Sequence, residues 1–105
     1  MNNILIDLAL ESNGGRTLLA SDDFFAPKEN LLKSGRGVFI EDKYTNQGKW
    51  MDGWESRRKR TEGHDWCILR LGKPGMIREL NIDTNHFMGN FPSHASVEAC
   101  TMPEY

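Results

Sequence analysis

Short apolar stretches alternate with turn-forming residues along this chain, which is the pattern of an all-β fold. The clearest case is 66–71, where Cys67, Leu69 and Leu71 share one parity and the residues between them face the opposite way. The sequence Gly-Lys-Pro-Gly at 72–75 then predicts a tight turn. Further strands are expected at 4–10, 17–21, 38–40, 76–84 and 95–100.

One short helical turn is the only helix that the sequence predicts. It covers 26–32, where Pro27 suits a first helical turn and Asp22 or Asp23 is placed to cap it. About six short strands with one helical turn favour a β-sandwich of the jelly-roll type. Because a two-sheet jelly roll generally uses about eight strands, we expect a single domain over 1–105 that is incomplete at its C-terminal end.

Composition and charge exclude several classes of partner. Thirteen Lys and Arg against fifteen Asp and Glu give a net charge of −2, so no overall field attracts nucleic acid or an anionic membrane. The longest apolar run, 4–10, is interrupted by Asp7 and is too short for a membrane span or a signal peptide. Cys67 and Cys100 lack a CxxC spacing and are expected to be reduced core thiols, which favours a cytoplasmic protein.

The densest chemistry lies at 49–66, which we call the charged tryptophan block. It contains three tryptophans, a histidine, several carboxylates and four consecutive cations at 57–60. A solvated charge run does not need three tryptophans, and a core strand does not carry this many charges. The block therefore predicts a site in which aromatic surfaces hold charged groups in place.

Blocks of residues in order from Ile6 to Cys100 resemble the allantoicase family. The longest is Trp-Met-Asp-Gly-Trp-Glu-Ser-Arg-Arg-Lys-Arg at 50–60, preceded by Ser-Asp-Asp-Phe-Phe-Ala-Pro at 21–27 and followed by Gly-His-Asp-Trp-Cys at 63–67. The resemblance implies a jelly-roll repeat of the galactose-binding-like type. It also implies hydrolysis of allantoate to ureidoglycolate and urea in purine breakdown, and a homo-oligomer for full-length members.

The chain departs from the family pattern in two ways. Leu10 stands where the family usually has a serine, for which we expect only a local effect. Family members are also about three times as long and carry two such repeats, whereas this sequence covers most of one. A site that draws on both repeats would leave this chain inactive alone.

Allantoate is a small carboxylate that carries two ureido groups, so its site needs a cationic clamp, acceptors for N–H groups and a group that moves protons. The block supplies each type of residue, although in an extended segment only two of the four cations at 57–60 face one side. The candidates for catalysis are Asp52, Glu55 and His64. The candidates for substrate binding are Arg57, Arg58, Arg60, Asp22 and Asp23.

Structural roles compete with each of these assignments. The arginines suit a solvated face or internal ion pairs, Asp52 suits a turn, His64 suits a loop hydrogen bond, and the tryptophans suit a core wall. The residues Asp83, His86 and Asn90 lie near a predicted strand end, where sandwich loops commonly carry function.

No metal site is assigned from the sequence. The histidines at 64, 86 and 94 have no recognised zinc spacing, and a divalent cation held by Asp oxygens stays an alternative. Two other functions remain open, because a fold does not fix a function. One is a noncatalytic module that binds a small ligand or carbohydrate, and the other is a fragment that contributes an interface within a longer polypeptide.

Overall fold

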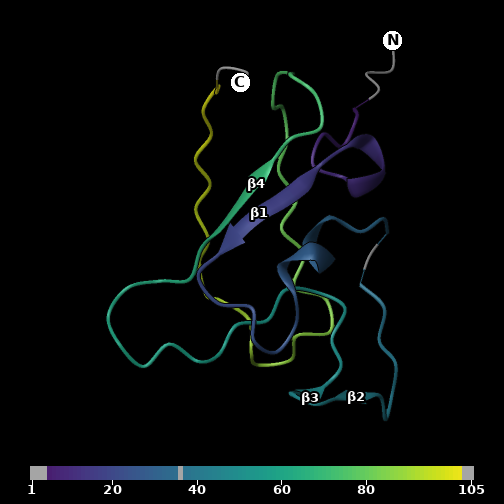
Figure 1. The fold of residues 1–105 in the computed structure, drawn as a ribbon, viewed down its shortest axis with the longest axis vertical. Helices are drawn as coiled ribbons and strands as arrows, with labels where there is room; N and C mark the ends of the chain where they lie inside the picture. Colours follow the sequence, from purple (N-terminus) through teal and green to yellow (C-terminus); the bar gives the residue numbers. More distant parts are fainter. Residues whose placement is uncertain (1–4, 36, 103–105) are drawn as a thin grey trace.

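The computed structural model describes residues 5–35 and 37–102 of the chain. Its strands are β1 (Arg16–Ala20), β2 (Tyr44–Thr45), β3 (Gly48–Lys49) and β4 (Cys67–Arg70), and its only helices are the 3₁₀ turns η1 (Glu11–Asn13) and η2 (Lys28–Leu32) (Figure 1). Within the described residues all regular structure is thus strand or 3₁₀ turn. The prediction of an all-β class with a short helical turn near 26–32 is confirmed.

Strands β1 and β4 form an antiparallel pair from segments about fifty residues apart in the sequence (Figure 1). Arg16 lies opposite Arg70 and Ala20 lies opposite Cys67, while a shift of register between Thr17 and Leu19 marks a β-bulge. The N–H of Ser21 extends the ladder by donating to the carbonyl of Trp66 at 2.9 Å. This extension brings the end of β1 to the end of the charged tryptophan block.

The second sheet is a hairpin of β2 and β3, with Tyr44 opposite Lys49 and Thr45 opposite Gly48. The N–H of Trp50 continues the pairing with a hydrogen bond of 2.9 Å to the carbonyl of Lys43. The Lys43 ammonium also lies 4.3 Å from the centre of a Trp50 ring. A cation over an aromatic face is attracted to it, so this contact supports the hairpin.

Several predicted strands do not form. The prediction for 4–10 is wrong within its described part: the Asp7 carboxylate accepts a hydrogen bond from the N–H of Ala9, and the Asp7 carbonyl accepts one from Leu10. These local bonds turn the chain before a strand can continue. The segments 38–40, 76–84 and 95–100 lie outside any strand in the described structure because no ladder pairs them, although Figure 1 shows the last as a long extended trace.

Very little of the chain is buried. Only Ala26, Leu32 and Met51 are buried hydrophobic residues among those described, at 3%, 7% and 8% exposure. The accessible surface is 9188 Å², against about 6,000 Å² expected for a compact protein of this mass. The radius of gyration is 15.1 Å, against about 13 Å for a compact domain of this length.

Many large apolar side chains lie on this surface. Ile6, Met76, Leu80 and Ile82 are each more than half exposed, and residues of this kind occur on every part of the described chain. Extensive apolar surface of this kind marks a region that packs against other polypeptide. The structure is therefore that of an incomplete sandwich, while the domain assignment for 1–105 stays a prediction.

Both cysteines are free, as expected, but only one approaches the core. Cys67 is half-buried, and burial raises the pKa of its thiol. Cys100 is exposed, so its prediction as a core residue is wrong, because the segment that carries it has no strand partner. No helix in the described part of the chain has the length and apolar character needed to cross a membrane.

Candidate functional site

The centre of the charged tryptophan block, 51–55, bends at Asp52 and Gly53 and is held by hydrogen bonds from the region around η2. The Asn30 amide donates to the carbonyls of Met51 and Gly53, at 3.4 and 3.2 Å. The backbone of Glu55 forms an isolated antiparallel bridge with Ala26, in which each N–H lies 3.1 Å from the carbonyl of the other residue. These bonds satisfy backbone groups that have no sheet partner and hold the segment in one conformation.

The same segment organises two loops from elsewhere in the chain. One carboxylate oxygen of Asp52 accepts a hydrogen bond from the N–H of Val38 at 2.8 Å. At Gly53 the ring of Phe87 approaches so closely that an added Cβ would lie 2.7 Å from its nearest carbon. A side chain at this position would therefore force the Phe87 ring or the backbone to shift, and the block contacts both 37–39 and 84–90.

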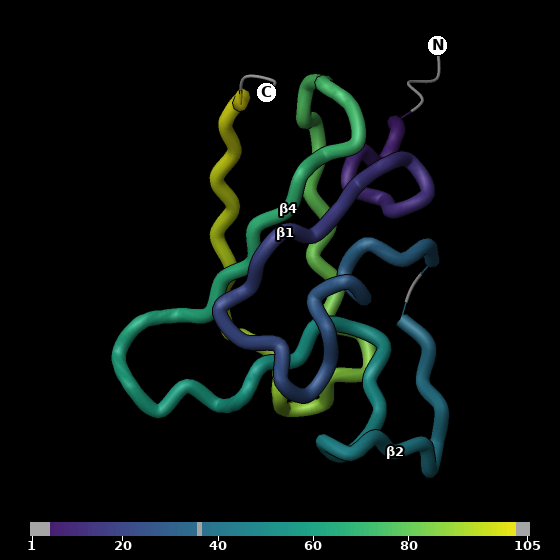
Figure 2. Tube along the Cα trace, viewed as in Figure 1, coloured from purple at the N-terminus to yellow at the C-terminus, as the bar shows by residue number. Residues whose placement is uncertain are grey.

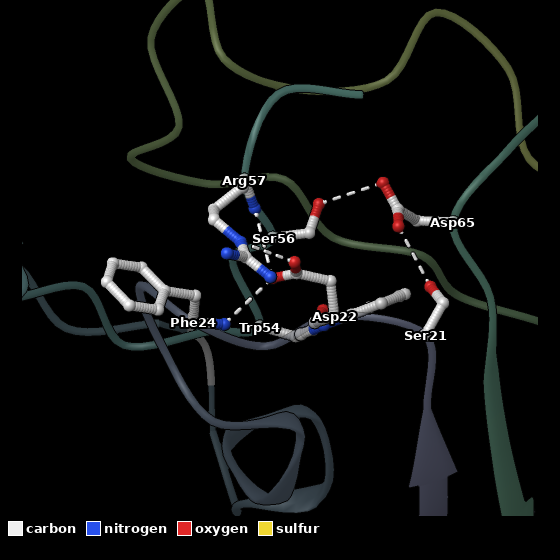
Figure 3. Close-up of polar contacts among 7 residues, drawn as sticks. All are labelled: Ser21, Asp22, Phe24, Trp54, Ser56, Arg57 and Asp65. Atoms are coloured by element: carbon white, nitrogen blue, oxygen red, sulfur yellow. Dashed lines mark hydrogen bonds and ion pairs between the residues drawn. The ribbon is translucent and has the colours of Figure 1, made fainter. Parts of the chain in front are cut away.

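Asp22 and Arg57 form the main ion pair near the end of β1 (Figure 3). The Arg57 Nε lies 2.7 Å from the Asp22 carboxylate, which also accepts from the N–H groups of Phe24 and Arg57 at 2.9 and 3.2 Å. The guanidinium lies 5.1 Å from the centre of the Phe24 ring, and the Trp54 Nε1 donates to the Asp22 carbonyl at 2.7 Å. Figure 3 shows these four residues as one cluster.

This cluster stabilises the ionised form of Asp22. The hydrogen bond from the Phe24 N–H is the largest influence, and it holds the pKa of the Asp22 carboxyl below its usual range, with Arg57 adding to the effect. Partial burial opposes the shift, since the side chain is only 16% exposed. Both Asp22 oxygens thus serve internal bonds, and the Arg57 side chain, at 63% exposure, is oriented by them.

A second carboxylate joins the block to β1. Asp65 accepts hydrogen bonds from the hydroxyls of Ser21 and Ser56, at 2.8 and 3.1 Å (Figure 3). The Ser21 hydroxyl in turn accepts from the N–H of Trp66 at 2.9 Å. Neither serine could be selected from the sequence pattern, because both contact Asp65 only in the folded chain.

Asp23 acts at the start of η2. Its carboxylate accepts a hydrogen bond of 3.2 Å from the N–H of Lys28, the first residue of that 3₁₀ turn. A free N–H at the start of a helical turn needs such an acceptor. The helix-capping interpretation of Asp23 therefore has a contact in the structure, whereas Asp22 caps no residue of η2.

Glu55 is linked to a hollow in the surface through one of the residues that line it. Its carboxylate accepts a hydrogen bond from the Asn90 amide at 2.9 Å. Asn90 lines an open depression of about 390 Å³. The other lining residues are Phe39, Lys49, Met51, His86 and Met88.

The Phe39 ring contacts two other side chains of this depression. The His86 imidazole stacks on the Phe39 ring with 5.6 Å between ring centres and 27° between planes. The Lys49 ammonium lies 4.8 Å from the centre of the same ring. Two of the residues noted near the predicted strand end, His86 and Asn90, thus line a hollow. The sequence did not predict that Phe39 and Lys49 lie beside them, because no local pattern links these residues to His86.

Other sequence-based candidates lie apart from these contacts. His64, Arg58 and Arg60 are exposed and have no hydrogen bond, ion pair or ring contact within 5–35 and 37–102. They belong to a loop that extends away from the paired strands (Figure 2). Asp52 lines a different depression, of about 480 Å³, with Glu11, Ser12, Lys33 and Ser34. No cluster of three potential metal ligands occurs among the described residues.

Comparisons with known proteins extend over the whole of this arrangement. Residues 6–105 match the allantoicase repeat family model. The probable allantoicase 1 of Burkholderia mallei is 56% identical over 99 residues, which cover 94% of this chain and 29% of that protein. A probable allantoicase of Photobacterium profundum is 52% identical over 94% of this chain and 30% of its own length.

Solved structures agree with the sequence matches. One allantoicase structure aligns with a TM-score of 0.52 and 31% identity, over 64% of this chain and 18% of that one. The allantoicase of Saccharomyces cerevisiae aligns with a TM-score of 0.51 and 34% identity, with the same shares covered. The chain spans less than a third of the length of these curated relatives. With a family match over 6–105 and similar structures of the same family, the chain belongs to the allantoicase family.

Proposed function

We propose that the protein to which this chain belongs is an allantoicase, which hydrolyses allantoate to ureidoglycolate and urea. The observation that carries the proposal is the family match over 6–105, which includes the entire charged tryptophan block. In the reaction, the oxygen of water bonds to the carbon that bears both ureido groups. The bond from that carbon to one ureido nitrogen breaks, and urea leaves after its nitrogen accepts a proton.

The residues of this chain offer groups for each part of that reaction. Glu55 is the candidate for proton transfer, because its carboxylate lies next to the depression and bonds only one amide in the described structure. Asp52 and His64 are weaker candidates in this proposal, since Asp52 lines the other depression and His64 lies in the exposed loop. Two sets of cations can bind the carboxylate, the arginines of the block and Lys49.

The rest of the polypeptide contributes to the site in this proposal. The exposed apolar surface needs further packing, and the relatives are more than three times as long as the matched segment. A homo-oligomer and a cytoplasmic location belong to the same proposal, and the two free thiols fit a reducing compartment. Binding of allantoate without turnover would instead identify the chain as a binding module.

The test is a graft that supplies the missing polypeptide. This chain replaces the matching 99-residue segment of the Burkholderia mallei relative, and urea and ureidoglycolate are measured with allantoate as substrate. We expect the graft and its parent to release both products in equal amounts. A graft that unfolds cooperatively like its parent but releases no urea, while the parent does, would overturn the proposal.

A further inference from the structure

The depression beside Glu55 gathers side chains from three separate parts of the chain. Phe39 comes from the segment after Gly37, Lys49 and Met51 from the start of the charged tryptophan block, and His86 with Asn90 from the loop that packs on Gly53. Its volume of about 390 Å³ falls in the usual range of small-molecule sites, about 300–1,000 Å³. Its lining includes an ammonium, an imidazole and an amide but no carboxylate.

His86 occupies a backbone position that ordinarily favours glycine. The N–H of Phe87 bonds the carbonyl of Thr84 at 3.1 Å, which makes 84–87 a β-turn with His86 as its third residue. The φ angle of His86 is 70°, in the left-handed region. A histidine held there costs free energy that glycine would not, and such positions cluster at functional sites.

The polar groups of the depression are held in place before any ligand arrives. The Phe39 ring contacts both the Lys49 ammonium and the His86 imidazole. The Asn90 amide is oriented by its bond to Glu55, which leaves its Oδ1 as an acceptor for an N–H group. Groups held in this way lose less conformational entropy when a ligand binds.

We propose that this depression is the substrate site, in which Lys49 and His86 bind the carboxylate of a ureido-substituted acid. The Asn90 Oδ1 and the Glu55 carboxylate accept N–H groups of a ureido substituent at the other end. This assignment rests on the proposed function, and it identifies Lys49 as the cation that binds the substrate carboxylate. It also places the carboxylate of Glu55 beside the nitrogen that must accept a proton when urea leaves.

The arginines of the block fit this task less well. Arg57 is already paired with Asp22 and lies against Phe24. Arg58 and Arg60 belong to an exposed loop in which they make no contact among the described residues, so binding through them must order the loop. None of the three arginines lines the depression.

The experiment compares two lysines of the same hairpin in the grafted protein. Lys49→Met removes the ammonium from the depression, whereas Lys43→Met removes an equal charge that lies over Trp50 and outside it. Calorimetry with N-carbamoylglycine, a carboxylate with one ureido group, measures binding without turnover. We expect Lys49→Met to weaken binding at least tenfold, Lys49→Arg to restore most of it, and Lys43→Met to leave it unchanged.

A second variant tests the imidazole. His86→Asn removes the ring but keeps a residue that tolerates a positive φ, and we expect it to raise the KM for allantoate at least fivefold while the thermal unfolding temperature is maintained. Equal binding by the Lys49→Met and unsubstituted grafts would overturn the assignment, as would equal losses in both lysine variants. Since binding of N-carbamoylglycine is measured separately from urea release, a failure of the proposed function is distinguished from a failure of this site.

Discussion

The carboxylate of Asp22 lies 2.7 Å from the Nε of Arg57, across 35 positions of sequence. The pair joins the segment after β1 to the charged tryptophan block, and the Trp54 indole supports it through the Asp22 carbonyl (Figure 3). Because both Asp22 oxygens are used internally, its main effect is on the position of Arg57 and the loop that follows. This assigns a structural role to a residue that the sequence proposed for substrate binding.

Asp22→Asn tests that role in the grafted protein. The substitution leaves the Phe24 N–H, the Arg57 N–H and the Arg57 Nε without an ionised acceptor, so we expect a loss of about 1–2 kcal/mol in the free energy of unfolding. The upper end is limited because the Arg57 side chain is 63% exposed and its ion pair is screened. Urea denaturation measures the loss, with Glu62→Gln at an exposed position as the control.

The same carboxylate predicts a dependence of stability on pH. The pKa of Asp22 is lowered in the folded protein, first by the Phe24 N–H, from an ordinary value of 3.8. Its contribution is therefore complete above pH 3.8 and is lost as the pH falls through the folded value. We expect the Asp22→Asn and unsubstituted grafts to converge in unfolding free energy under acid. A stability difference that is the same at pH 7 and pH 2.5 would contradict this account.

Part of the fold follows from local pattern, and this part was predictable. The alternation at 66–71 matches β4, and the Pro27 signal matches the start of η2. The strand expected at 76–84 has similar alternation but no partner in the described chain, and alternation alone cannot form a ladder. The site was less predictable still, because Asn30, Val38 and Phe87 reach the block only through contacts distant in sequence.

Gly53 provides a test of how the block positions the 84–90 loop. In Gly53→Ala the new methyl group would lie 2.7 and 2.9 Å from two carbons of the Phe87 ring, so the ring or the backbone must move. We expect a loss of about 1–3 kcal/mol in the free energy of unfolding. A double-mutant cycle with Phe87→Leu measures the coupling, which should recover part of the loss because the two residues touch. If the losses in Gly53→Ala and Phe87→Leu simply add in the double variant, the contact between residues 53 and 87 is not the cause of the destabilisation.

Asn30 also holds the block, and replacing its amide donor with a carboxylate tests this contact. Asn30→Asp keeps the shape of the side chain but faces the carbonyls of Met51 and Gly53 with an acceptor in place of a donor. We expect a loss of about 1–3 kcal/mol at neutral pH, monitored by urea denaturation. Asn46→Asp, in the exposed loop between β2 and β3, is the matched control and should change stability by less than about 0.5 kcal/mol.

Substitutions of His86 are expected to affect stability and ligand binding differently, whereas a residue with only a structural role would change both together. Glycine adopts a φ of 70° without strain. His86→Gly should therefore leave the free energy of unfolding unchanged or raise it by up to about 1 kcal/mol. His86→Val places a β-branched residue at the same φ and should lower it by about 1–2 kcal/mol. Both variants lose the imidazole that stacks on Phe39, so both should bind N-carbamoylglycine more weakly. Weak binding by a variant that is as stable as the unsubstituted protein would show that His86 contributes to ligand binding and not to the stability of the fold. Undiminished binding by His86→Gly would remove His86 from the site.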